Sequence, residues 1–407
     1  MTDGGDAPQA PPPLPGPGAS GPPPIPSPPP LEADDRAAYQ VTENTRTYPC
    51  RQCGAQLVFD IAQQKLACPS CGFAADIDTS QLHDPTEHDF ASTMGEIRAA
   101  MGTVAPPQIA GEKEIVCQNC GGHTTFSGTL TATRCPYCAT PIQRDDVHDA
   151  PARLPVDGVL PFQVDEKKAR VALEEWINGR WFAPSEFKKY KETGAFSSVY
   201  AAYFTFDSET RTRYEGQRGD DYTVTVGSGE NRRTETRTSW HHVSGQVANS
   251  FDDLTVLAND GFDPKRVKQL EPWPTQTARP FSPEFVAGHL SRTYDRDADG
   301  CFPEAKAEMD AAIENTIRAD IGGDHQRISR ADTRHDTLTF KHLLLPIWLL
   351  TVIYEGKPFQ VFINGVTGEV QGQRPWSKVK IAAAVVAGVI VALIVLYLYS
   401  KTKSTSG

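Results

Sequence analysis

The strongest hydrophobic pattern in the chain is a single run near its C-terminal end. Ile381–Tyr399 forms nineteen consecutive positions without a charged side chain. As an α-helix this run would extend about 28 Å, close to the ~30 Å hydrocarbon core of a bilayer. Trp376 falls just before the run, where interfacial aromatic residues usually lie. The pattern predicts one transmembrane helix over residues 380–399, followed by a short tail at 400–407.

The charges around this helix predict its orientation. Three basic residues between positions 374 and 380 outnumber the two that follow the run, Lys401 and Lys403. This bias favours a cytoplasmic location for the N-terminal side. Residues 1–30 have no basic residue and no apolar segment of the kind that a secretory signal requires. We therefore expect a tail-anchored, single-pass protein of the inner or cytoplasmic membrane, with the bulk of the chain in the cytoplasm.

Mixed helix and strand patterns between residues 155 and 375 predict one α+β domain. Val164–Trp176 and Pro303–Ile321 have apolar positions at helical spacing. Ser198–Asp207 is an aromatic-rich strand pattern, and Tyr222–Val226 alternates as a strand does. We expect residues 234–247 to pair with the latter, around a hydrophilic and solvated hairpin turn.

A strongly apolar hairpin is predicted at the end of this domain. His342–Tyr354 and Phe359–Asn364 flank a short Glu-Gly-Lys turn. The first segment is apolar enough to raise the possibility of a second membrane span. It has only thirteen residues and is interrupted by Pro346, so a buried strand is the better prediction.

Two segments outside this domain have different compositions. Residues 1–38 form a proline-rich tail, with thirteen prolines in the first thirty positions. Such a segment buries too little apolar surface to fold and should be disordered and extended. Residues 79–112 are predicted to be a helical linker, because Asp84–Met101 places Phe90, Met94 and Ile97 on one helical face.

Two cysteine quartets with the same spacing, C-x2-C-x14-C-x2-C, lie at residues 46–78 and 113–144. A C-x2-C turn directs two thiolates to one point, and a glycine after the second cysteine allows a positive φ there. Two such turns joined by a hairpin of about fourteen residues form a zinc ribbon. The repeated spacing suggests an internal duplication. The predicted metal ligands are Cys50, Cys53, Cys68, Cys71, Cys117, Cys120, Cys135 and Cys138.

The donor set predicts the kind of metal site. In a reducing compartment such quartets bind metal rather than form disulfides. Four cysteines complete a tetrahedral shell and leave no open position, so both sites should be structural and not catalytic. We expect two Zn²⁺ ions, although iron also fits a tetrahedral four-sulfur shell. Cys301, the ninth cysteine, lies outside both quartets, with no partner base identifiable.

The charge pattern bears on nucleic-acid binding. The whole chain has a net charge of -11. From Arg46 to Asp146 there are seven Lys or Arg and eleven Asp or Glu residues, and no basic stripe is evident. Because phosphate binding requires local positive charge, nucleic acid is an unlikely partner for the ribbons, and a protein surface is the better expectation.

No enzyme motif is evident in the sequence. There is no G-x-x-x-x-G-K-[ST], G-x-S-x-G or H-E-x-x-H pattern. His241 and His242 are adjacent in a predicted strand, so they should point to opposite faces. The acidic segment Asp295–Gly300 resembles the start of a calcium loop but lacks the required glutamate. We therefore predict no catalytic and no cofactor-binding residues, and a protein that is not an enzyme.

Several segments of the chain together form a distinctive set. Besides the second cysteine quartet, they are Tyr48–Asp60, Cys68–Gly72, Leu160–Phe162, Trp181–Phe187, Val199–Gly216, Leu343–Trp348 and Val361–Pro375. With these segments the chain resembles a bacterial family of membrane-anchored, TFIIB-type zinc-ribbon proteins, whose members are often labelled primosomal protein N′-like or helicase-like. Where that family reads a proline in its aromatic strand, this chain has Ala201-Ala202.

The resemblance implies a function class but no reaction. Similar proteins are encoded beside SPFH or flotillin-like proteins and phage-shock-type membrane proteins, which implies protein partners at the membrane. The sequence thus favours a tail-anchored cytoplasmic adaptor or scaffold that presents protein-binding surfaces and holds structural zinc. The alternative is a membrane-tethered, nucleic-acid-binding zinc-ribbon protein, in line with the helicase-like label.

Overall fold

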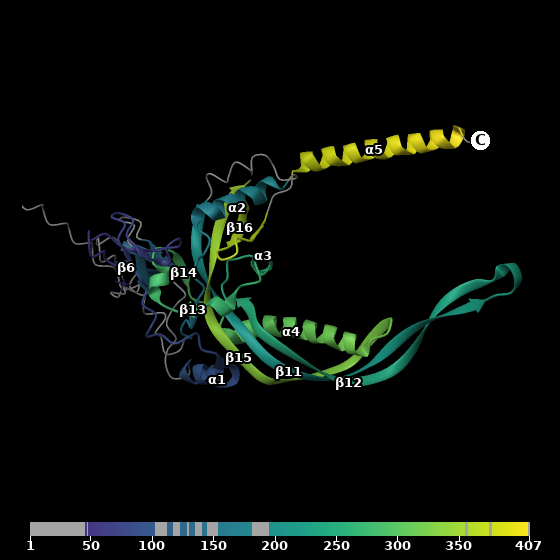
Figure 1. Ribbon diagram of the computed structural model, residues 1–407, viewed down its shortest axis with the longest axis horizontal. Coiled ribbons are helices and arrows are strands. Elements are labelled where there is room, and N and C mark those ends of the chain that lie inside the picture. Colours follow the sequence, from purple (N-terminus) through teal and green to yellow (C-terminus); the bar gives the residue numbers. More distant parts are fainter. Residues whose placement is uncertain are drawn as a thin grey trace, which may run out of the picture.

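The structure is a mixed α+β fold built on one large sheet, with an apolar C-terminal helix (Figure 1). It is a computed structural model. The residues that it describes are 45–46, 48–101, 112–116, 123–127, 130–134, 141–144, 154–180, 195–354, 357–373 and 377–405.

The centre of the sheet is β11 (Ala195–Val226), a strand of 32 residues. It pairs antiparallel with β12 (Arg233–Leu257) on one side and with β15 (His325–Tyr354) on the other. Every residue of its segment 200–206 is buried. Because side chains alternate between the faces of a strand, this segment packs against a core on each side of the sheet.

Shorter strands extend the sheet around these three. The apolar hairpin of β15 with β16 is present, as the sequence predicted, and β16 continues into β17 through a tight turn. The other described strands of this sheet pair at its edges. Their bounds are β1 (Thr45–Arg46), β5 (His88–Asp89), β8 (Leu130–Arg134), β9 (Pro141–Arg144), β10 (Gly158–Val159), β13 (Arg279–Pro280), β14 (Leu290–Arg292), β16 (Lys357–Asn364) and β17 (Val370–Gly372).

Helix α4 (Ala298–Ile321) lies along one face of β11, β12 and β15 (Figure 1). It buries Ile313 and Ile317 against Tyr214 and Val247 of the sheet. The other helices are α1 (Phe90–Met101), α2 (Glu166–Asn178), α3 (Pro264–Lys268) and α5 (Lys378–Thr405), and 3-10 turns occur at Gly229–Asn231, Thr275–Thr277 and Pro283–Val286.

The hairpin of β11 and β12 continues beyond the rest of the sheet as a two-stranded arm, which we define as residues 220–239. Strand β15 begins at His325, opposite Gly219, so the arm has no third strand among the described residues. Figure 1 shows the arm reaching past the end of α4. Tyr222 is 48% exposed, and Gly227 and Gly229 adopt a positive φ at the turn. The predicted solvated hairpin is therefore present, on strands much longer than expected.

Several predicted boundaries were wrong; the strand predicted to begin at His342, for example, begins at His325. The two strands expected at 198–207 and 222–226 are parts of one strand, because ladders on both sides carry β11 through the polar residues between them. Helix α4 begins at Ala298 rather than Pro303, since the Asp297 side chain caps it by accepting from the Gly300 N–H at 2.8 Å.

Another wrong boundary is in the linker. Its helix begins at Phe90 and not at Asp84, because His88 and Asp89 pair with β15 instead. Phe90 packs against the sheet, and Met94 and Ile97 are buried. The predicted apolar face is therefore the face that docks on the large domain.

Helix α5 contains the predicted membrane span. An 18-residue window, Val379–Leu396, is long and apolar enough to cross a bilayer, and none of it is buried in the protein. A soluble core helix would be covered by other elements. The helix begins a few residues after β17.

Candidate metal centre

The first cysteine quartet forms a three-stranded module that we call ribbon 1, residues 48–75. Its strands are β2 (Val58–Asp60), β3 (Lys65–Ala67) and β4 (Ala74–Ala75). Strands β2 and β3 pair antiparallel, so the predicted hairpin between the two cysteine pairs is confirmed.

Each cysteine pair of ribbon 1 ends in a glycine turn, as the sequence predicted. The N–H of Gly54 donates to the Cys50 carbonyl at 2.9 Å, and Gly72 donates to Cys68 at 3.0 Å. The two glycines have φ values of 74° and 76°. No atom lies within 4 Å of the position that a Cβ would occupy at either one. Glycine is favoured here by backbone conformation and not by lack of space.

The four sulfur atoms of ribbon 1 are arranged to hold one metal ion. The ligand atoms of Cys50, Cys53, Cys68 and Cys71 all lie within 4.8 Å of one another. The Sγ atoms of Cys50 and Cys71 are 3.6 Å apart, and those of Cys53 and Cys68 are 3.5 Å apart. Zinc bonded to four thiolates at about 2.3 Å places the sulfurs about 3.8 Å apart. The four residues therefore fit a tetrahedral metal ion.

Ribbon 1 is docked on the α+β domain through its hairpin. The backbone N–H of Phe59 donates to the Ala287 carbonyl at 2.9 Å, and the Phe59 ring lies 5.6 Å from the Phe285 ring, edge to face. The Gln64 amide donates to the Phe162 carbonyl at 2.6 Å. Phe59 is only 3% exposed. The metal-binding module is thus part of the main hydrophobic core.

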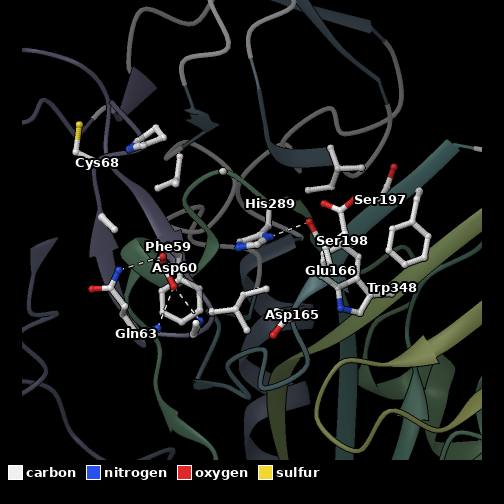
Figure 2. Close-up of a pocket in the computed structure, with 18 of the residues that line it drawn as sticks. Phe59, Asp60, Gln63, Cys68, Asp165, Glu166, Ser197, Ser198, His289 and Trp348 are labelled. Atoms are coloured by element: carbon white, nitrogen blue, oxygen red, sulfur yellow. Dashed lines mark hydrogen bonds between the residues drawn. The ribbon is translucent and has the colours of Figure 1, made fainter. Parts of the chain in front are cut away.

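A cavity of about 620 Å³ lies between ribbon 1 and the domain. Figure 2 shows Phe59 and Gln63 on the ribbon side, facing His289, Ser198 and Trp348. The His289 Nδ1 and Ser198 Oγ atoms are 2.7 Å apart. The His289 ring also stacks on Phe162, with the ring centres 5.2 Å apart. These contacts fix His289 as part of the junction between the two units.

The second predicted quartet, Cys117, Cys120, Cys135 and Cys138, lies outside the residues that the structure describes. The strands beside it are described. Strand β6 (Glu112–Val116) ends just before Cys117, and β8 ends just before Cys135. Strand β6 pairs with β7 (His123–Ser127), whereas β8 pairs with β9 and joins the large sheet through β14. Metal binding by the second quartet stays a prediction.

Cys301 is buried in α4 and is unsuited to surface chemistry. It has no exposed surface, and burial raises the pKa of its thiol to about 12. A thiol that stays protonated at neutral pH is a poor nucleophile and a poor metal ligand. The sequence offered no partner base for Cys301, and its burial is a second reason to expect an unreactive thiol.

One ionic cluster had no signal in the sequence. The Lys341 ammonium group lies 2.9 Å from the Asp253 carboxylate, 3.3 Å from Glu87 and 3.8 Å from Asp207. Burial raises the pKa of Asp207 to about 6. The four residues come from distant parts of the chain, so only folding brings them together. Within this cluster, the Glu87–Lys341 pair joins the linker segment before α1 to the sheet.

A second pair reinforces the same junction. His88 Nε2 lies 2.7 Å from the Asp157 carboxylate, whose side chain is 8% exposed. This hydrogen bond raises the pKa of His88 above its ordinary value, against the opposing effect of burial. The Arg98 side chain of α1 also pairs with Asp299 of α4 at 2.7 Å. The linker between the two cysteine quartets is thus fastened to the domain at several points.

Comparison with known proteins found one distant relative that covers most of the chain. The chain is 26% identical over 342 residues to YdjG, an uncharacterized protein of Bacillus subtilis (strain 168). The alignment covers 83% of this chain and 92% of that protein. No family model matches the chain, and no solved structure matches it. The aligned length is far greater than that of the two cysteine quartets.

Proposed function

We propose that this chain is a membrane-anchored adaptor that holds structural zinc and presents protein-binding surfaces next to the bilayer. The observation that carries the proposal is the combination, in one chain, of a complete four-thiolate cluster and an uncovered helix of membrane-spanning length. The thiolate cluster suits a structural metal ion, and the exposed apolar helix suits attachment to a membrane. The bulk of the chain would lie on the cytoplasmic side.

The cluster in ribbon 1 supports a structural role for the metal. Four cysteine ligands saturate a tetrahedral ion, so no position is open for substrate or water. Ribbon 1 is small, and modules of this size need a metal because their apolar core is too small to hold the fold alone. Zinc would therefore keep the hairpin in the shape that docks on Phe285 and Ala287.

The exposed arm supports the adaptor role. It extends beyond α4 and β15, and it exposes Tyr222 and most of its other side chains. Exposed strand edges are common sites of protein association, because their backbone groups accept a further strand. The partners suggested by the resemblance, SPFH or flotillin-like and phage-shock-type membrane proteins, are the first that we would test.

The proposal can be tested by purifying the full chain from native membranes in mild detergent. Bound proteins would be identified by mass spectrometry, and bound nucleic acid would be measured in the same samples. A Cys50→Ser variant removes one ligand of ribbon 1. The matched control, Cys301→Ser, changes a buried cysteine that lies far from the cluster in sequence and outside it.

We expect a defined membrane protein to co-purify with the wild type and with Cys301→Ser, and to be lost with Cys50→Ser. Retention of that partner by Cys50→Ser would separate ribbon 1 from the contact and direct attention to the arm. If nucleic acid were recovered instead, and released by moderate salt, the adaptor proposal would fail in favour of the nucleic-acid-binding alternative.

A further inference from the structure

The two long edges of the three-stranded region β12–β11–β15 are protected to very different degrees. Along β15, residues 325–338 pair with no outer strand among the described residues, but this edge is irregular. Two register shifts leave Ser329 and Asp336 without an opposed residue. Arg330, Asp332 and Arg334 are all exposed on it. Bulges and charges are the usual means by which a protein prevents an edge strand from pairing.

The outer edge of β12 has none of these features over most of its length. Its pairing with β11 is continuous from Arg233 to Phe251, with no register shift. Within this stretch, residues 238–251 contain no Lys, Arg, Asp or Glu. The structure describes no strand on the outer side of β12. A long, regular and uncharged edge is a favourable template for another strand.

The charges of β12 lie at its two ends and have opposite signs. Arg233 and Arg237 outnumber Glu235 near the tip of the arm, whereas Asp252 and Asp253 lie at the base. At the base, the edge is closed by α3, where the Lys268 ammonium group donates to the Thr255 carbonyl at 3.2 Å. The available edge is therefore basic at one end and acidic at the other.

We propose that this edge pairs with the same edge of a second copy of the chain, antiparallel and about a two-fold axis. An edge with opposite charges at its ends is complementary to itself only in the antiparallel direction. An axis near Val243, the midpoint of residues 233–253, places Arg233 of each copy near the exposed Asp252 of the other, while the Asp253 carboxylate stays paired with Lys341 of its own copy. No like charges then face each other along the strand. The pairing joins two three-stranded regions into one six-stranded sheet.

This pairing would also support the arm. Two-stranded ribbons are only marginally stable in water. In a single copy, residues 233–239 of β12, which belong to the arm, pair with β11 alone among the described strands. In the dimer the same residues lie along residues 247–253 of the partner, which supply a third strand. The proposal is independent of the adaptor role. It does, however, predict that the dimer has two copies of every surface of the domain.

The oligomeric state of the full chain tests the proposal. It would be measured by light scattering over a range of protein concentrations, in detergent and in nanodiscs made from one kind of lipid. The double variant His242→Lys and Ser244→Lys puts like charges opposite each other near the axis, because residue 242 of one copy faces residue 244 of the other, and both side chains are exposed. The matched control is Ser329→Lys with Thr337→Lys, which places the same charges on exposed positions of the β15 edge.

We expect a wild-type dimer that the control variant retains. The β12 variant should weaken dimerisation by about tenfold or more, since like charges directly opposed on neighbouring strands are destabilising. Mixing it with the His242→Glu and Ser244→Glu double variant should restore a dimer of the two variants, which a merely misfolded variant would not do. A monomeric wild type, a β12 variant that dimerises normally, or a mixture without restoration would each overturn the proposal.

Cross-linking provides a second readout on the same edges. With a short bismaleimide, Ser244→Cys should give a covalent dimer in membranes, while Ser329→Cys should give only the wild-type background. Both residues are exposed and lie on edge strands. Equal cross-linking at the two positions would contradict the proposed interface.

Discussion

Ribbon 1 and the arm are both β-hairpins attached to the same domain, but different forces stabilise them. Ribbon 1 has strands of only two or three residues. It is held by four converging thiolates and by the packing of Phe59 into the main core. The arm has long strands, no such cluster, and mostly exposed side chains. A short hairpin thus needs ligands and a core, whereas a long one can rely on continuity with the central sheet.

Loss of one metal ligand should produce the largest effect. In Cys50→Ser, ribbon 1 should lose its metal ion, because three cysteines bind far more weakly than four. Metal binding contributes on the order of 10 kcal/mol to the folding of isolated zinc modules. Elemental analysis should show one ion fewer per chain, and hydrogen exchange should show lost protection in residues 48–75. The arm should keep its protection. Unchanged metal content would disprove the assignment of the site.

Removal of the docking side chain should give the next largest effect. Phe59→Ala deletes a ring that is 3% exposed and packs on Phe285. Substitutions of this kind cost about 3–5 kcal/mol in the free energy of unfolding. Denaturant unfolding of the full chain, with metal content measured in parallel, would check this value. A loss below about 1 kcal/mol would mean that ribbon 1 does not share the core of the domain.

The junction between the linker and the sheet should depend on pH. Because its pKa is raised in the folded state, protonated His88 stabilises the fold fully below about pH 6.5, its unfolded value. That contribution is lost as pH rises through the raised pKa. Thermal unfolding should therefore show lower stability at pH 8 than at pH 6, and His88→Gln should remove part of the difference. His83→Gln, at an exposed position, should not.

An aromatic substitution on the arm should have the smallest effect. Tyr222→Ala changes a side chain that is 48% exposed. Exposed substitutions usually alter the free energy of unfolding by about 0.5 kcal/mol or less. Measured beside Phe59→Ala under the same conditions, this variant provides the direct comparison of the two hairpins. A cost near that of Phe59→Ala would show that the arm is packed against another surface in the intact protein.

The sequence predicted those parts of the fold whose signal is local. The spacing of Cys50, Cys53, Cys68 and Cys71 was sufficient to predict the ribbon, since each pair lies in one short turn and a single hairpin joins the two pairs. The apolar run from Ile381 was sufficient to predict the anchor helix. Helix α2 and the β15–β16 hairpin also followed from local patterns.

Other features could not be predicted from local patterns. The polar residues between Phe206 and Tyr222 have no strand pattern of their own, yet they continue β11 because strands lie on both sides of it. Backbone pairing across the sheet outweighs weak local preference there. The meeting of Lys341 with Glu87, Asp207 and Asp253 depends on side-chain contacts between residues that lie at least 88 positions apart in the sequence.

The amino-acid sequence by itself thus determined the four-cysteine cluster of ribbon 1, a C-terminal helix long and apolar enough to span a membrane, and the mixed α+β class. Each depends on residues that lie near one another in the chain. Only the tertiary structure decided where ribbon 1 docks, how far the arm extends, and which sheet edge is left open. Those features arise from hydrogen bonds and apolar contacts between distant segments, and a pattern read along the chain contains no record of them.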